Sequence, residues 1–159
     1  MLKFHNFDIV FQEIPGETTL AVNITGCPFR CKGCHSPHLW EDTGEPLSQE
    51  ALRTLYERYS SGVTCIALMG GDADPAEVSS LAGFIKDVLH LKSAWYSGAP
   101  ALSDKVDVRN FNFIKVGPYQ EEHGGLKSGD TNQRLYAVAQ DGTLTDITPK
   151  IREVHKHFD

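Results

Sequence analysis

The sequence predicts an α/β domain built on a mostly parallel sheet. Strand-like segments alternate with helix-like segments along the chain, which is the order that βαβ units produce. A continuous apolar run at residues 63–69 has the length of a strand covered on both faces, as strands of parallel sheets are. The 159 residues are too few for a complete (β/α)8 barrel, which needs about 250. We therefore expect a single domain, residues 1–159, folded as a partial barrel or a small open sheet.

Two strands and a helix are expected in the first part of the chain. Residues 6–12 and 18–25 have the pattern of strands, and Pro15-Gly16 between them is a turn signal. Ser48 can cap a helix, because apolar residues recur after it at helical spacing: Leu52, Leu55, Tyr56 and Tyr59. The helix is expected to end at Gly62, just before the apolar strand at residues 63–69.

A second helix is expected to begin at Pro75. Asp74 stands at its N-cap position and Glu77 three residues later, which is the order of a capping box. Two further strands are expected at residues 93–97 and 111–116. After a long Gly-rich loop, the expected elements are two hairpin strands around Asp141-Gly142, at residues 134–139 and 143–147, and a short helix after Pro149.

The unusual residues of this chain fall directly after four of the predicted strands. They are the cysteine segment that begins at Cys27, Gly70-Gly71-Asp72, Tyr96-Ser97-Gly98 and Gly117-Pro118-Tyr119. In α/β folds the carboxyl ends of parallel strands meet at one edge of the sheet, and ligands bind there. The sequence therefore predicts one site to which four strand ends contribute.

Charge and hydropathy exclude several classes of protein. The chain has 15 Lys and Arg against 21 Asp and Glu, a net charge of -6, and no block of basic residues. Nucleic-acid binding is not expected, because neutralising phosphates requires clustered cations. No apolar run approaches the roughly 20 residues of a membrane span, and the first residues lack a signal-peptide core. We expect a cytoplasmic protein with no nucleic-acid or membrane partner.

The four cysteines have the pattern of a metal site rather than of two disulfides. Cys27, Cys31 and Cys34 form a Cx3Cx2C motif within eight residues, whereas Cys65 lies in the apolar strand and is expected to be a core residue. Clustered thiolates select iron–sulfur clusters or zinc. Three thiolates on a four-iron cluster leave one coordination position open, as catalytic metal sites do.

Two other interpretations of the motif remain at this point. A structural zinc site would take His35 or His38 as its fourth ligand, although zinc sites usually contain two pairs of ligands and no second pair is present. A redox dithiol formed by Cys31 and Cys34 would leave Cys27 without a role.

The motifs carry a family resemblance. Cx3Cx2C after an early strand, with Gly-Gly-Asp after the next strand, resembles the radical S-adenosylmethionine (SAM) superfamily. Residues 27–40 (CPFRCKGCHSPHLW) look like the small activating proteins of anaerobic ribonucleoside-triphosphate reductase. Three further segments look like other blocks of that family: 95–98 (WYSG), 117–119 (GPY) and 128–134 (SGDTNQR).

The resemblance implies a partial TIM-like barrel of the radical SAM type with a 4Fe-4S cluster. Cys27, Cys31 and Cys34 would be the metal ligands and the catalytic residues, and the amino and carboxylate groups of SAM would chelate the open iron. One electron would cleave SAM to methionine and a 5′-deoxyadenosyl radical, which takes a hydrogen from a glycine Cα. The implied partners are a glycyl-radical reductase subunit as protein substrate and an electron donor such as flavodoxin or ferredoxin.

Residues after the later strands are candidates for binding SAM. Gly70 and Gly71 let the backbone approach a ligand, so their carbonyls can accept from the methionine ammonium group, and Asp72 adds a complementary charge. Ser97 stands where the ribose or the carboxylate would lie. A cation, Lys115 or Arg134, can hold the carboxylate.

One position departs from the related family. That family has an aspartate directly before the Gly-Pro pair, and here the residue is Val116. Two alternatives to the activase remain: another small radical SAM enzyme with a different substrate, and a zinc-binding interaction module without catalysis. Iron and sulfide content would distinguish the zinc-binding module from a radical SAM enzyme.

Overall fold

An eight-stranded mixed sheet is the centre of the fold. The computed structural model describes residues 2–11, 14–26, 44–59, 62–118, 120, 122, 126, 128 and 131–151. Within these residues the strand order is β3-β1-β2-β4-β5-β6-β7-β8. The strands are β1 (Lys3–Val10), β2 (Thr19–Ile24), β3 (Glu45–Pro46), β4 (Cys65–Met69), β5 (Lys92–Tyr96), β6 (Phe113–Val116), β7 (Arg134–Val138) and β8 (Leu144–Asp146). The helices are α1 (Gln49–Tyr59), α2 (Pro75–Asp87) and the 3-10 turn η2 (Val108–Asn110), and residues 148–151 are helical as well.

Parallel pairing is confined to the middle of the sheet. Strand β4 lies parallel to β2 on one side and to β5 on the other, and β6 lies parallel to β5. The outer pairs β1–β2, β1–β3, β6–β7 and β7–β8 are antiparallel. The expected mostly parallel sheet is therefore corrected to a mixed one. Parallel strands need a long crossover between them, and the connections β1–β2 and β7–β8 are too short for one.

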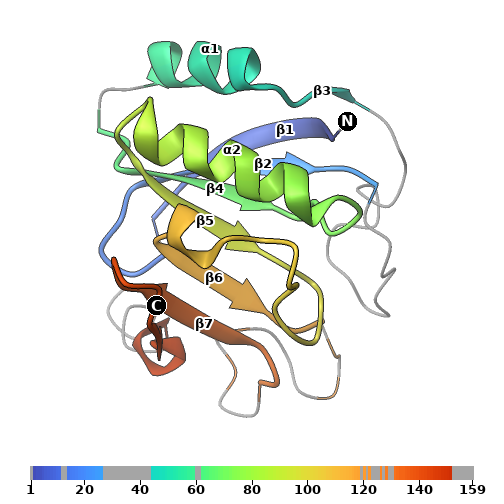
Figure 1. Cartoon of the computed structure of the whole chain (residues 1–159), viewed down its shortest axis with the longest axis vertical. Helices are drawn as coiled ribbons and strands as arrows, with labels where there is room; N and C mark the ends of the chain where they lie inside the picture. The colour runs from blue at the N-terminus through green and yellow to red at the C-terminus, as the bar shows by residue number, and fades with distance from the viewer. Residues whose placement is uncertain are drawn as a thin grey trace.

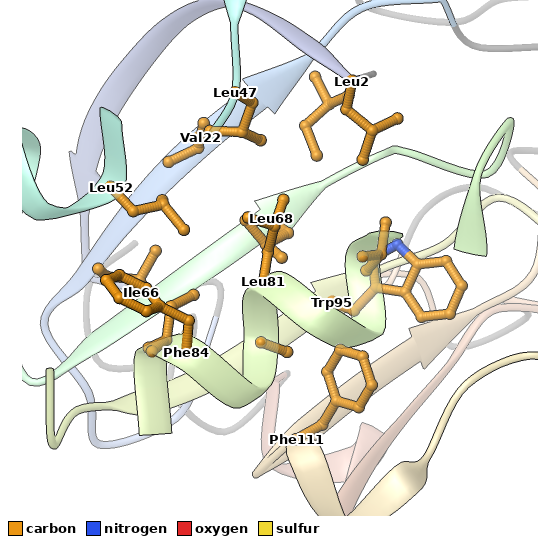
Figure 2. Packing of buried hydrophobic residues seen from close by; sticks show 14 of the residues in the cluster. Leu2, Val22, Leu47, Leu52, Ile66, Leu68, Leu81, Phe84, Trp95 and Phe111 are labelled. Carbon is orange, nitrogen blue, oxygen red and sulfur yellow. The ribbon is translucent and has the colours of Figure 1, made fainter. Parts of the chain in front are cut away.

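The main apolar core lies between the sheet and the two α-helices. Figure 1 shows α2 lying across the central strands, with α1 beside β1. Ile66 and Leu68 of β4 are fully buried, and Leu81 of α2 is buried in the same cluster (Figure 2). The indole of Trp95 stacks on the ring of Phe111, with ring centroids 5.9 Å apart. Large apolar side chains thus fill the helix side of the central strands.

Helix α1 has the predicted start and the predicted apolar face. The Ser48 hydroxyl accepts a hydrogen bond from the Ala51 amide at 3.1 Å, which confirms the expected N-cap. Leu52 and Leu55 are buried against the sheet, as their spacing indicated. None of the helices in the described part of the chain is long and apolar enough to cross a bilayer.

The second face of the central strands carries small residues. Cys65 and Ala67 of β4 and Ala94 of β5 are buried there, under Ile14 and Ile147 from outside the strands. Both faces of β4 are therefore covered, which confirms the prediction made from its continuous apolar run.

Of the two hydrogen bonds of the expected capping box, one forms at the start of α2 and the other does not. The Asp74 carboxylate accepts from the Glu77 amide at 3.3 Å, as a capping residue should. The Asp74 amide, however, donates to the Gly71 carbonyl, and the Glu77 carboxylate accepts from the Leu2 amide at 3.1 Å. The reciprocal bond is thus replaced by one that ties the start of β1 to α2.

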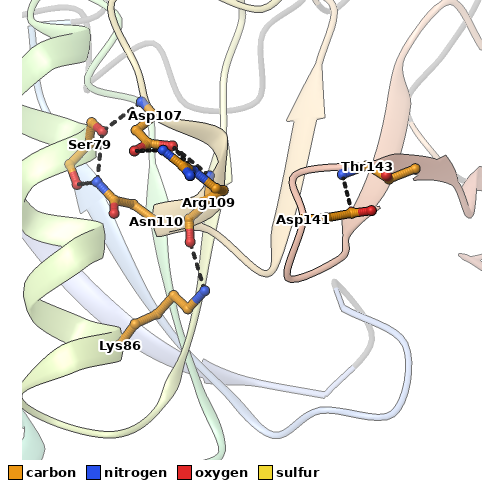
Figure 3. A network of polar contacts seen from close by, with 7 residues as sticks. All are labelled: Ser79, Lys86, Asp107, Arg109, Asn110, Asp141 and Thr143. Carbon is orange, nitrogen blue, oxygen red and sulfur yellow. Dashed lines mark hydrogen bonds and ion pairs between the residues drawn. The ribbon is translucent and has the colours of Figure 1, made fainter.

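The connection between β5 and β6, which the sequence left unassigned, is anchored to α2 by polar contacts. The Asn110 amide group donates to the Ser79 carbonyl at 3.0 Å, and the Ser79 hydroxyl accepts from the Asp107 amide at 3.0 Å (Figure 3). Lys86 donates to the Arg109 carbonyl at 2.8 Å. These contacts hold η2 against the helix.

Asp74→Ala tests the capping of α2. We expect it to lower the free energy of unfolding by about 1 kcal/mol, because one amide at the helix start loses its acceptor. Asp87→Ala is the matched control: it removes the same group from the other end of α2, where a negative charge opposes the helix dipole. Urea denaturation of both variants checks the prediction, and equal losses would contradict it.

Candidate functional site

The carboxyl ends of four strands meet at one edge of the sheet. The arrows of β2, β4, β5 and β6 point the same way in Figure 1. Near this edge Asn23, Met69, Tyr96 and Lys115 are partners in register across the four strands. The predicted convergence of these strand ends is therefore confirmed.

Gly70 and Gly71 form a tight turn directly after β4. Their backbone φ angles are +102° and +88°, values that residues other than glycine rarely adopt. The Gly70 carbonyl accepts from the Trp95 indole at 2.6 Å, so the turn is tied to the apolar core. A Cβ atom on Gly70 would lie 3.3 Å from the carbonyl oxygen of Ile24, the last residue of β2. The glycine turn thus packs against the strand end from which the cysteine segment leaves.

Asp72 joins the end of β4 to the end of β5. One oxygen of its carboxylate accepts from the Ser97 hydroxyl, and the other accepts from the Gly98 amide at 3.0 Å. The Ser97 hydroxyl also accepts from the Ala99 amide, and Ser97 is fully buried. Both predicted residues lie at the expected edge, where they bind each other. Their contact with a ligand stays a prediction.

Lys115 extends this network to the end of β6. It is buried, and its ammonium group donates to the Ser97 carbonyl at 3.1 Å and to the Gly117 carbonyl at 2.8 Å. The Gln133 side chain approaches the same Gly117 carbonyl at 3.4 Å. The sequence signal for Lys115 was a cation inside an otherwise apolar strand. The partners of its ammonium group could not be read from that signal.

Asn132 and Gln133 close the connection between β6 and β7. Asn132 donates to the Pro118 carbonyl at 3.0 Å, across fourteen residues of chain. Gln133 reaches the neighbouring Gly117, so these two side chains at the end of the connection hold it to its start. This part of the family-like block therefore has a structural role within the described residues.

Arg134 and Lys115 lie on opposite faces of the sheet. Arg134 is the register partner of Val116, which belongs to the helix-side core, whereas Lys115 and its partner Leu135 lie on the opposite face. The Arg134 guanidinium is 3.6 Å from the Asp146 carboxylate, and both side chains are well exposed. Partial burial acts to raise the pKa of Asp146, but hydrogen bonds from Thr148 and the charge of Arg134 bring it below its usual value. The role of Arg134 in binding SAM stays a prediction.

Val116 faces apolar surroundings. It lines a cavity of about 300 Å³ with Ile114, Tyr136 and other apolar residues. An aspartate at this position would place a carboxylate against these apolar residues, opposite its register partner Arg134, whereas valine packs against them without desolvating a charge. The departure from the family pattern therefore suits the local structure.

The three clustered cysteines, Cys27, Cys31 and Cys34, lie outside the described residues, as do His35 and His38. The described cysteine, Cys65, is fully buried as the first residue of β4. Burial, together with the nearby Glu17 carboxylate, raises the pKa of its thiol to about 12. A fully buried thiol offers no open face to a cluster, which makes Cys65 a poor ligand. Within the described residues no group of three His, Cys, Asp or Glu side chains is placed to hold a metal ion.

Comparison with known families identifies the type of domain. The model of a family described as a 4Fe-4S single cluster domain matches residues 15–102, more than half of the chain. The chain belongs to this family. A comparison with curated proteins and one with solved structures each found no match. This 4Fe-4S single cluster domain spans the cysteine segment and the Asp72–Ser97 contact, and it ends before Arg134.

Gly71→Ala tests the close packing of the glycine turn. A Cβ atom there would lie 2.6 Å from a methyl group of Val78 at a positive φ. We expect a loss of about 2 to 4 kcal/mol in the free energy of unfolding, from backbone strain and overpacking together.

Gly16→Ala is the matched control for Gly71→Ala. Gly16 also has a positive φ, but a Cβ atom would meet nothing within 4 Å. Its expected loss is about 1 kcal/mol, from the backbone alone. Chemical denaturation measures both variants, and a Gly16 variant as unstable as the Gly71 variant would disprove the packing explanation.

Proposed function

We propose that this 4Fe-4S domain is a radical SAM activase that generates a glycyl radical on anaerobic ribonucleoside-triphosphate reductase. The observation that carries the proposal is that a single-cluster family matches a segment with three clustered cysteines, while the fourth cysteine is unsuited to ligation. Cys27, Cys31 and Cys34 would hold three irons of a four-iron cluster, and the fourth iron would then be open to a small-molecule ligand.

The position of Cys65 supports a three-cysteine site. It is the register partner of Thr19, at the amino end of β2, whereas the cysteine segment follows the carboxyl end at Ile24. The length of β2 between these two residues is roughly 16 Å at 3.3 Å per residue. Cys65 therefore lies at the opposite edge of the sheet from the start of the cysteine segment, and its thiol is buried in the core.

Residues at the carboxyl edge suit the binding of SAM. When bound, the cluster and SAM supply one-electron cleavage of SAM to methionine and the 5′-deoxyadenosyl radical that takes a hydrogen atom from glycine. Among the described residues, the carbonyls of Gly70 and Gly71 each accept one hydrogen bond, and the second lone pair of a carbonyl oxygen could accept from the methionine ammonium group. The backbone at Ser97 and Gly98 is held by Asp72 beside them.

The expected protein partner also fits the fold. The four parallel strands β2, β4, β5 and β6 would be the barrel-like part of a radical SAM domain, half the strand number of a full barrel. Such a partial barrel leaves the cluster edge open to a loop of another protein. The reductase subunit would supply the glycine, and flavodoxin or ferredoxin would supply the electron.

A second candidate is another small radical SAM enzyme. Asn132 and Gln133, in the block that looks like the activase family, make hydrogen bonds inside the protein. That block therefore serves the fold and does not by itself select the reductase. A glycyl-radical signal formed on the reductase distinguishes the activase from this alternative.

Electron paramagnetic resonance tests the proposed function. We expect anaerobic reconstitution with iron and sulfide to give a brown protein whose reduced 4Fe-4S spectrum changes when SAM is added. With the reductase and a reductant present, a glycyl-radical signal should follow. A cluster whose spectrum is indifferent to SAM, or tightly bound zinc in place of iron, would refute the proposal.

Cysteine variants test the ligand assignment. Cys31→Ala is expected to lose cluster binding and SAM cleavage, because it removes one of three ligands. Cys65→Ala is the matched control and should retain both, since its thiol is buried in the core. Iron content and 5′-deoxyadenosine formation are the measurements. Cleavage retained by the first variant or lost by the second contradicts the assignment.

A further inference from the structure

Lys115 is a buried cation at the centre of the candidate site. It is 8% exposed and is the third residue of β6. Taking an ammonium group out of water is costly unless hydrogen bonds replace its hydration. Its ammonium group is bound by the carbonyl oxygens of Ser97 and Gly117, at 3.1 and 2.8 Å. These two residues directly follow the ends of β5 and β6.

The contacts of Lys115 join a wider network along the edge. The backbone of Ser97 also donates to the Lys115 carbonyl at 2.8 Å, so the two residues are bound twice. The hydroxyl of Ser97 donates to Asp72, which follows β4. Gln133, which precedes β7, approaches the Gly117 carbonyl. The ends of β4, β5 and β6 and the start of β7 are thereby connected by a network in which the Lys115 side chain bridges β5 and β6. The Ser97 hydroxyl and Asp72 add β4 to the network, and Gln133 adds β7.

We propose that Lys115 is a positioning residue for SAM: its ammonium group fixes the backbone at Ser97 and Gly117, and thereby the surface on which SAM binds. This inference rests on the proposed function. Replacing Lys115 by an apolar residue would leave two carbonyls at this edge without this donor. Such groups move toward water or other donors. The strand ends would then shift, although the cysteine segment is untouched.

Lys115→Met is the direct test, because methionine has a similar length and no donor. We expect the iron and sulfide content and the reduced spectrum without SAM to match those of the unaltered protein. The dissociation constant for SAM, measured by anaerobic equilibrium dialysis, should rise roughly tenfold to hundredfold, the range that loss of a hydrogen bond to a charged group predicts. Saturating SAM should restore the change in the spectrum.

Lys86→Met is the matched control. Lys86 on α2 also donates to a backbone carbonyl, that of Arg109 at 2.8 Å, but this contact is exposed (Figure 3). Its SAM affinity should equal that of the unaltered protein. Lys115→Arg keeps donors for both carbonyls and should bind SAM more tightly than Lys115→Met does. A merely structural role would lower the melting temperature without this order of affinities.

Each outcome bears on the inference. SAM affinity within about twofold of the unaltered protein in Lys115→Met would overturn it, as would loss of iron together with SAM binding. If Lys115→Met does not fold, Lys115→Gln replaces it, since an amide can still donate to one carbonyl, and unchanged SAM affinity in that variant would overturn the inference equally. Failure of the unaltered, cluster-loaded protein to bind SAM would instead refute the proposed function, and is seen before any variant is made.

Discussion

Parallel pairing of β2, β4, β5 and β6 is the constraint on which the rest of the molecule depends. Parallel strands require cover on both faces, which explains the continuous apolar sequence of β4 and the two separate core clusters. The same pairing brings the strand ends to one edge. The glycine turn, the Asp72–Ser97 contact and the Lys115 ammonium group are close together only because the register places them there.

The edge is rigidified by polar groups that bind each other. Asp72 accepts from Ser97 and Gly98, and Lys115 donates to two carbonyls, so charged side chains hold the loops after three strands. Trp95 ties the Gly70 carbonyl to the apolar core. A site built in this way is preorganised, because its backbone acceptors are fixed before a ligand arrives. This arrangement suits a cofactor that is recognised largely by carbonyl oxygens.

The chemistry of the proposed site depends on three cysteines acting as cluster ligands while the fourth, Cys65, does not. Membership in the 4Fe-4S single cluster family accounts for the cluster, and burial of Cys65 removes the fourth thiol from the set of ligands. The proposal of an open iron follows from that count. Zinc was the main competing interpretation of the motif, and the family match favours iron and sulfide over it.

The sequence by itself determined the order of the longer strands and the two α-helices, the helix caps at Ser48 and Asp74, and the strand ends at which the special residues lie; it did not predict β3 or η2. The predicted features depend on local periodicity, on capping side chains and on glycines, so neighbouring residues suffice to predict them. Only the tertiary structure decided that the pairs β1–β3 and β6–β7 are antiparallel, that Glu77 bonds to Leu2 and that Arg134 lies on the face opposite Lys115. Those outcomes depend on pairing between segments far apart in the chain, about which local patterns carry no information.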